Sequence, residues 1–166
     1  MSLSIQKRST YMSIQSLRTI QGLLLKSLGC IFVLSSIFKL IGLRTFAITV
    51  NDFCGFLGYE LLYGHGMLLA VMICTAELGL GLAALIPSLR NYVIWLYPLV
   101  LGYFTYITGL NLLSMYGQIE SCGCFGEVIH LTPSASFYKN VVLLSASLIG
   151  CVLTFILGNP HREEIG

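Results

Sequence analysis

The stretch MLLAVMICTAELGLGLAALI, residues 67–86, decides the fold. Its length matches the ~20 apolar residues that an α-helix needs to cross a bilayer, and Glu77 is its only charged side chain. The rest of the chain is similar, because 56% of its 166 residues are hydrophobic and 10% are charged. A soluble domain carries about 25% charged residues. The sequence therefore predicts an integral membrane protein.

Further apolar segments of similar length accompany this one, at residues 22–42, 92–115 and 137–157. Pro98 lies near the start of the third predicted span and is expected to kink that helix. Thr132 and Pro133 form a helix start signal ahead of the fourth span, because threonine can cap the backbone and proline suits the first helical position. Gly79 and Ala83, four residues apart, suit close helix packing. We expect an all-α fold, an integral membrane four-helix bundle.

The predicted spans form one membrane domain, residues 22–157, between two polar segments. Residues 1–21 are polar and basic, so we expect a tail or a short surface helix there. Residues 158–166 are expected to form a polar C-terminal tail. Residues 43–65 mix polar and apolar side chains, which suits a loop with a short interfacial helix around residues 46–63.

The basic residues predict the orientation of the spans, because membrane proteins carry an excess of Lys and Arg on the inner side. Four spans place both termini on one side. With that side inside, the inner basic residues are Lys7, Arg8, Arg18, Lys26, Arg90 and Arg162, and the outer ones are Lys39, Arg44 and Lys139. This excess favours an N-in, C-in topology in which the two longer loops, residues 43–65 and 116–136, face outward. In a bacterium these loops would extend from the inner membrane into the periplasm, where disulfides persist.

The second outer loop carries Ser121-Cys122-Gly123-Cys124-Phe125-Gly126-Glu127, the candidate chemical centre. A disulfide needs its two Cα atoms about 4.4–6.8 Å apart, and Gly123 and Gly126 permit the backbone bend that would bring Cys122 and Cys124 together. A ring this small would be strained and easily reduced. Such a disulfide would exchange electrons rather than stabilise the fold, because the loop that it closes contains almost no residues.

Two other interpretations of this pair remain open. The cysteines could stay reduced and pack near the membrane interface. They could also bind a metal ion, with His130 and His65 as further soft ligands, although zinc sites usually space their cysteines by two to four residues.

The remaining cysteines lie singly among apolar residues. Cys30, Cys74 and Cys151 are expected to pack as small hydrophobic side chains. Cys54 lies in the first outer loop and is a candidate supporting thiol.

Ionisable residues near the predicted spans are further candidates for supporting roles. Glu77 lies mid-span, where ionisable groups are costly and usually paired, and Lys39 on a neighbouring helix is its candidate partner. The pair would either relay protons near the thiols or fix the register of two helices. Lys139 would either lower the pKa of a thiol or anchor its helix. Glu127 and His130 could move protons during exchange.

The cysteine motif at 121–127, followed by Leu131-Thr132-Pro133 and FYKN at 137–140, resembles the MauE branch of the DoxX-like membrane proteins. IFKL at 37–40 and Glu77 also match. The resemblance implies a four-helix bundle, distantly similar to the vitamin K epoxide reductase type. It also implies thiol–disulfide traffic outside the cytoplasm with a thioredoxin-like partner. Quinone-linked reductases of that type use Cys-x-x-Cys and commonly a second pair in the first outer loop, whereas this chain has Cys-x-Cys and Cys54 alone.

The leading hypothesis is a membrane thiol–disulfide oxidoreductase in which Cys122 and Cys124 exchange electrons with a periplasmic thioredoxin-like protein or a larger membrane complex. The alternatives are a non-catalytic membrane subunit that assembles or docks another complex, and an outward-facing metal site. The sequence requires no cofactor, and a quinone is the one that this activity could use. The net charge of +2 and the scattered basic residues give no indication of nucleic-acid binding.

Overall fold

The structure of this chain, a computed structural model, describes residues 2–113 and 132–157, with side chains from residue 14 onward. These residues form α1 (Ser2–Ile41), α2 (Leu43–Phe56), α3 (Gly66–Leu85), α4 (Pro87–Val93), α5 (Leu96–Leu113) and α6 (Pro133–Leu157), with no strand among them. Four helical segments are long and apolar enough to cross a membrane: Ile14–Ile41 of α1, and the whole of α3, α5 and α6. The predicted all-α fold with four spans is confirmed.

The first helix differs from the expected one at its start. The first span was expected to begin at residue 22, after a tail or a short surface helix, whereas α1 is one continuous helix from Ser2. The physical reason is that residues 2–21 contain no glycine or proline, so nothing in that stretch interrupts the backbone hydrogen bonds of a helix.

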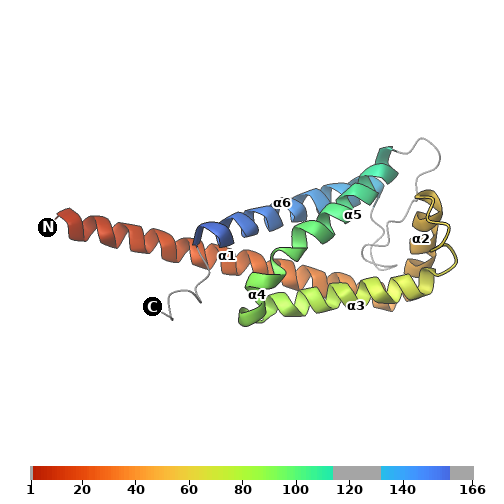
Figure 1. The fold of residues 1–166 in the computed structure, drawn as a ribbon, viewed down its shortest axis with the longest axis horizontal. Coiled ribbons are helices and arrows are strands. Elements are labelled where there is room, and N and C mark those ends of the chain that lie inside the picture. The colour runs from red at the N-terminus through yellow and green to blue at the C-terminus, as the bar shows by residue number, and fades with distance from the viewer. Residues whose placement is uncertain (1, 114–131, 158–166) are drawn as a thin grey trace.

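The four spanning helices lie side by side, with α1 against α3 and α6, and α5 against α6. Figure 1 shows α2 running across one end of this bundle, where α3 and α6 begin and α5 ends. The other end carries α4 and the end of α6. Large apolar side chains such as Leu23 and Phe155 are exposed on the outer faces, as is expected where lipid surrounds the helices.

The helix across the end of the bundle is shorter than expected. The interfacial helix was expected around residues 46–63, whereas α2 ends at Phe56 and turns follow up to His65. Gly58 and Gly64 account for the difference, because their φ angles of 73° and 89° lie in the left-handed region that glycine tolerates. The chain can therefore leave α2 and enter α3 within a few residues.

Close packing between α1 and α3 depends on Gly29 and Gly81. A Cβ atom added at either glycine would lie 2.9 Å from the carbonyl oxygen of the other. Gly79 and Ala83 were expected to allow close packing of a neighbouring helix, but a Cβ atom added at Gly79 would meet nothing within 4 Å. The expected small-residue packing therefore exists on α3, but on the face that carries Gly81.

The third predicted span is interrupted rather than kinked. It was expected to cover residues 92–115, but α4 ends at Val93 and α5 begins at Leu96. Pro98 lacks the N–H that would bond to the carbonyl oxygen of Ile94 in a continuous helix. The thiol of Cys151 on α6 instead donates a hydrogen bond to that oxygen, at 3.3 Å.

Candidate functional site

Lys39 near the end of α1 and Glu77 in the middle of α3 form a buried ion pair. Nζ of Lys39 lies 2.5 Å from Oε1 of Glu77, and the two residues are 3% and 5% exposed. One turn earlier on each helix, the Ser36 hydroxyl donates to the carbonyl oxygen of Cys74 at 2.8 Å. These contacts and the glycine crossing hold α1 and α3 in a fixed register.

The sequence positions of Lys39 and Glu77 suggest different depths in the membrane, yet the side chains meet. Helix side chains tilt toward the N-terminus of their own helix. Because α1 and α3 run antiparallel, Lys39 tilts toward the bundle centre and Glu77 tilts toward the end covered by α2. The two side chains therefore approach each other from opposite directions.

Aromatic rings complete the surroundings of the ammonium group. Nζ of Lys39 lies 5.1 Å from the ring centroid of Phe46 on α2 and 5.3 Å from that of Phe104 on α5. Such cation–π contacts stabilise a desolvated ammonium group by up to about 2 kcal/mol. Helices α1, α2, α3 and α5 thus converge on one charged atom.

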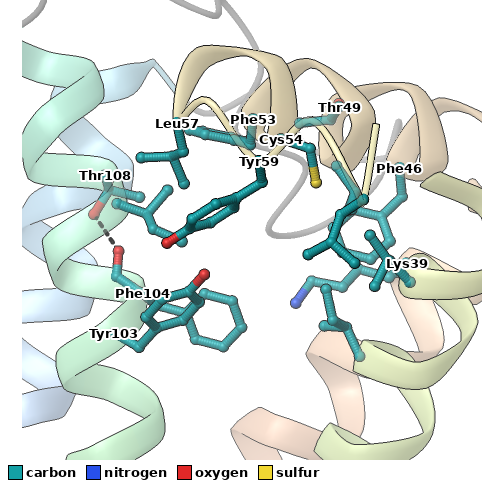
Figure 2. A pocket seen from close by; sticks show the side chains of 15 residues that line it. Lys39, Phe46, Thr49, Phe53, Cys54, Leu57, Tyr59, Tyr103, Phe104 and Thr108 are labelled. Atoms are coloured by element: carbon teal, nitrogen blue, oxygen red, sulfur yellow. Dashed lines mark hydrogen bonds between the residues drawn. The ribbon is translucent and has the colours of Figure 1, made fainter. Parts of the chain in front are cut away.

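A cavity of about 160 Å³ lies between this ammonium group and α2. Figure 2 shows α2 and the following turn on one side of it, Tyr103, Phe104 and Thr108 of α5 on another, and Lys39 at its edge. The hydroxyl group of Tyr59 interacts with that of Tyr103. The other lining residues are mainly apolar: Phe46, Thr49, Val50, Phe53, Cys54, Leu57, Leu62, Leu69, Ile73 and Ile107. The cavity suits an apolar molecule that carries a hydrogen-bond acceptor.

Lys39 also lines a smaller cavity of about 30 Å³, which Glu77, Lys139 and Asn140 help to line. Oε2 of Glu77 is buried and has no hydrogen-bond partner among the described residues. A volume of about 10–15 Å³ is enough to admit one water molecule when polar partners are present. The smaller cavity is therefore large enough for a water molecule that could donate a hydrogen bond to Glu77.

Cys54 of α2 lines the larger cavity and is 6% exposed. Burial raises the pKa of its thiol above the ordinary value, so the neutral thiol predominates at neutral pH. Of the other isolated cysteines, Cys74 and Cys151 are buried as expected, whereas Cys30 is exposed on the surface of α1.

The predicted chemical centre lies outside the described residues, as do its two neighbouring proton carriers: Cys122, Cys124, Glu127 and His130. Its attachment points are described. Leu113 ends α5 and Thr132 precedes α6, at the end of the bundle that α2 covers. Lys139, expected near the cysteine loop, lies on the second turn of α6 and lines the smaller cavity.

Some site residues were not predicted from the sequence. Phe46 and Phe104, which flank the ammonium group, were not among the candidates, and neither was the cavity. One available signal was the apolar spacing of Phe46, Val50, Phe53 and Leu57, which places these side chains on one face of α2. Within residues 14–113 and 132–157, no three His, Cys, Asp or Glu side chains gather as a metal site would require.

These features define a multi-pass helical membrane protein in which a short helix covers an apolar cavity beside a buried Lys–Glu pair. The chain belongs to the MauE family, because the model of Methylamine utilisation protein MauE matches residues 18–153. It is also 28% identical over 145 residues to Protein TlpB of Flavobacterium psychrophilum. That match covers 81% of this chain but only 36% of TlpB, so the chain spans little more than a third of that relative's length. No solved structure matches the chain significantly.

Membership of the MauE family confirms the core of the resemblance seen in the sequence. The wider similarity to DoxX-like proteins and to the vitamin K epoxide reductase type stays a prediction.

Proposed function

We propose that this chain is a membrane thiol–disulfide redox protein whose Cys122 and Cys124 exchange electrons with a thioredoxin-like partner. In each exchange, a thiolate of the reduced pair attacks a sulfur of the oxidised pair and forms a mixed disulfide. The second thiol of the attacking pair then displaces the partner's remaining sulfur. Two electrons and two protons thereby pass from the dithiol to the disulfide, and neither protein needs a further reactant.

The observation that carries this proposal is the attachment of the cysteine segment. It joins Leu113 to Thr132, both at the end of the bundle covered by α2, in a chain of the MauE family. Short tethers at this end would keep Cys122 and Cys124 beside the membrane surface, where a soluble partner can reach them.

The proposed orientation places that end in the periplasm of a bacterium and both termini in the cytoplasm. Arg18 and Arg90 line one common cavity at the opposite end, and Lys26 also lies on the half of α1 near that end. At the end covered by α2, Lys39 is neutralised by Glu77. The basic excess away from α2 supports this orientation under the positive-inside rule.

The cavity below α2 fits the ring of a quinone, which is the cofactor that we propose for this site. Its volume of about 160 Å³ is close to the ~150 Å³ of a dry apolar cavity that holds benzene. Lys39 would donate a hydrogen bond to a carbonyl oxygen, and Phe46 and Phe104 would border the ring. A bound quinone would supply a two-electron acceptor. The residues of this chain would exclude water and stabilise negative charge near Nζ of Lys39.

Thiol trapping in intact cells tests the redox proposal. A membrane-impermeant, mass-tagging maleimide is applied with and without mild reduction to the wild type and to a Cys122→Ser/Cys124→Ser variant. We expect tagging of the pair only after reduction, and no such gain in the double variant. Cys30→Ser is the matched control, since this cysteine lies on α1 within a span and its replacement should leave the pattern unchanged. Tagging only after permeabilisation would contradict the orientation.

A second experiment separates electron exchange from the two alternatives. Cys122→Ser and Cys124→Ser single variants are isolated under acid quench and examined for a mixed disulfide with another protein. We expect one variant to accumulate this adduct, because the resolving thiol is missing. Loss of complex assembly without any adduct would favour the non-catalytic subunit. Metal retained by the wild type and lost from the double variant would favour the metal site.

A further inference from the structure

A polar cavity lies at the end of the bundle opposite α2. It has a volume of about 200 Å³, and Arg18 and Gln21 of α1 line it together with Arg90 and Asn91 of α4. The end of α6 at Leu157 closes part of it. Two guanidinium groups from helices far apart in sequence therefore share one small polar space.

The side chain of Arg90 is oriented by a hydrogen bond to the end of α3. Its Nε donates a hydrogen bond to the carbonyl oxygen of Ala84 at the end of α3, at 3.2 Å. Its Nη1 points toward α1, where a Cβ atom added at Gly22 would lie 3.6 Å away. The remaining N–H groups of the guanidinium fork are thus held near Arg18, with little side-chain entropy left to lose on binding.

Gln21 is fixed as well. Its Nε2 donates to the Thr154 hydroxyl of α6 at 2.7 Å, which anchors the amide at the edge of the cavity. The cavity is therefore lined by one exposed cation, Arg18, together with an oriented cation and an oriented amide.

No carboxylate in the described part of the chain balances these charges. The acidic residues there are Asp52, Glu60 and Glu77, which lie on α2, on the turn after it and in the pair with Lys39. Two cations that share a cavity repel each other, and an anion with several oxygen atoms relieves this repulsion while accepting hydrogen bonds from both.

The location indicates which anion. The cavity lies where the spanning parts of α3 and α6 end, at Leu85 and Leu157, which is the level of the lipid headgroups. Exposed apolar side chains adjoin its lining residues in sequence, at Ile20, Ile86 and Leu89. Basic pockets between spanning helices at this level bind the headgroups of anionic lipids.

We infer that Arg18 and Arg90 form a binding site for the phosphate group of an anionic phospholipid. The guanidinium of Arg90 provides the oriented fork, Arg18 completes the charge, and the exposed apolar side chains contact the acyl chains. The site is independent of the proposed redox activity, because it lies at the other end of the molecule.

Native mass spectrometry of the purified full-length protein tests this site, with phosphatidylglycerol and phosphatidylcholine of identical acyl chains as probes. We expect the wild type to retain one phosphatidylglycerol and to bind phosphatidylcholine at least about ten-fold more weakly, because only one of the two lipids carries a net charge. Arg18→Gln/Arg90→Gln should lose this preference. Arg90→Lys should keep only part of it, because an ammonium group cannot form the bidentate fork. Arg44→Gln at the other end of the bundle is the matched control and should behave as the wild type.

Equal retention of phosphatidylglycerol by the double variant and the wild type would overturn the proposal, as would equal binding of the two lipids. Inorganic phosphate is a separate arm: competition by phosphate at the affinity of the lipid would assign the same site to a soluble anion.

A Glu163→Gln/Glu164→Gln variant tests the C-terminal carboxylates as occupants. Lipid retention that arises only in this variant would overturn the proposal. If the double arginine variant fails to fold, Arg18→Gln alone gives the same comparison, since Arg18 is exposed.

Discussion

Glu77 accepts a hydrogen bond from Lys39 through one carboxylate oxygen, while its other oxygen is buried without a partner in the described part of the structure. This asymmetry distinguishes the pair from a fully satisfied structural ion pair. One oxygen fixes the helix register, and the residue that carries the other also lines the smaller cavity.

We predict that Glu77→Gln destabilises the protein by about 3–5 kcal/mol, because removing one member of a buried pair leaves the other charge uncompensated. Lys39→Met/Glu77→Gln should recover most of this loss. Thermal unfolding in lipid–detergent micelles measures both, and the double-mutant cycle gives the coupling energy. Glu60→Gln, in the exposed turn after α2, is the control. A double variant as unstable as Glu77→Gln alone would contradict the prediction.

Gly81→Ala should destabilise the bundle by about 1–3 kcal/mol, since the added methyl group would lie 2.8 Å from Val33 and 2.9 Å from the backbone of Gly29. Gly79→Ala is the matched control on the same helix, because nothing lies within 4 Å of the new atom. It should be neutral or stabilising by up to about 1 kcal/mol through helix propensity. The difference in unfolding temperature between the two variants checks this prediction, and equal effects would refute the close crossing.

The alkylation of Cys54 should depend on pH differently in the folded and the denatured protein. Burial raises the pKa of this thiol, and the thiolate is the reacting form. We therefore expect folded Cys54 to react slowly at neutral pH and to accelerate only above the ordinary thiol pKa of about 8.5. Because the folded state holds this proton more tightly, the thiol's contribution to stability falls as pH rises above that value. Peptide-resolved mass spectrometry gives the rates, and equal rates in sodium dodecyl sulfate and in mild detergent would contradict the prediction.

Val50→Trp should fill the cavity below α2 and block a quinone while leaving the helix intact. We expect the quinone-dependent reoxidation of Cys122 and Cys124 to slow by about ten-fold or more, since the ligand volume is lost. Ile48→Trp is the control, because Ile48 is 63% exposed and does not line this cavity. Unchanged reoxidation in Val50→Trp would show that the acceptor binds elsewhere.

Hydropathy was enough to predict the four spans, because neither soluble nor fibrous proteins contain such long apolar segments. The sequence did not reveal where the first helix begins, since residues 2–21 are polar and basic and lack the apolar character that marks a span. It also did not reveal that α4 and α5 are separate. Pro98 signals a disturbance of the helix but not its extent, and the partner of the freed Ile94 carbonyl oxygen is the thiol of Cys151, a residue of another helix.

The candidate site was predicted only in part for a similar reason. Lys39 and Glu77 were recognisable because charges inside a span are costly and need partners. Their aromatic neighbours were not, because Phe46 and Phe104 belong to an abundant class of side chains and meet only through the tertiary fold. The cavity is a property of four helices together, and no local pattern records its volume.

The hydrogen bond from Cys151 to Ile94 has a consequence for disulfide fidelity. A buried thiol that donates its hydrogen bond to a backbone carbonyl oxygen is a poor competitor for oxidants that arrive at the surface. Cys74 is buried in the same way. Under the proposed redox function, burial lowers the risk that Cys74 or Cys151 pairs wrongly with Cys122 or Cys124. Cys30 is exposed on α1 but lies within a span, away from an oxidant that arrives at the surface.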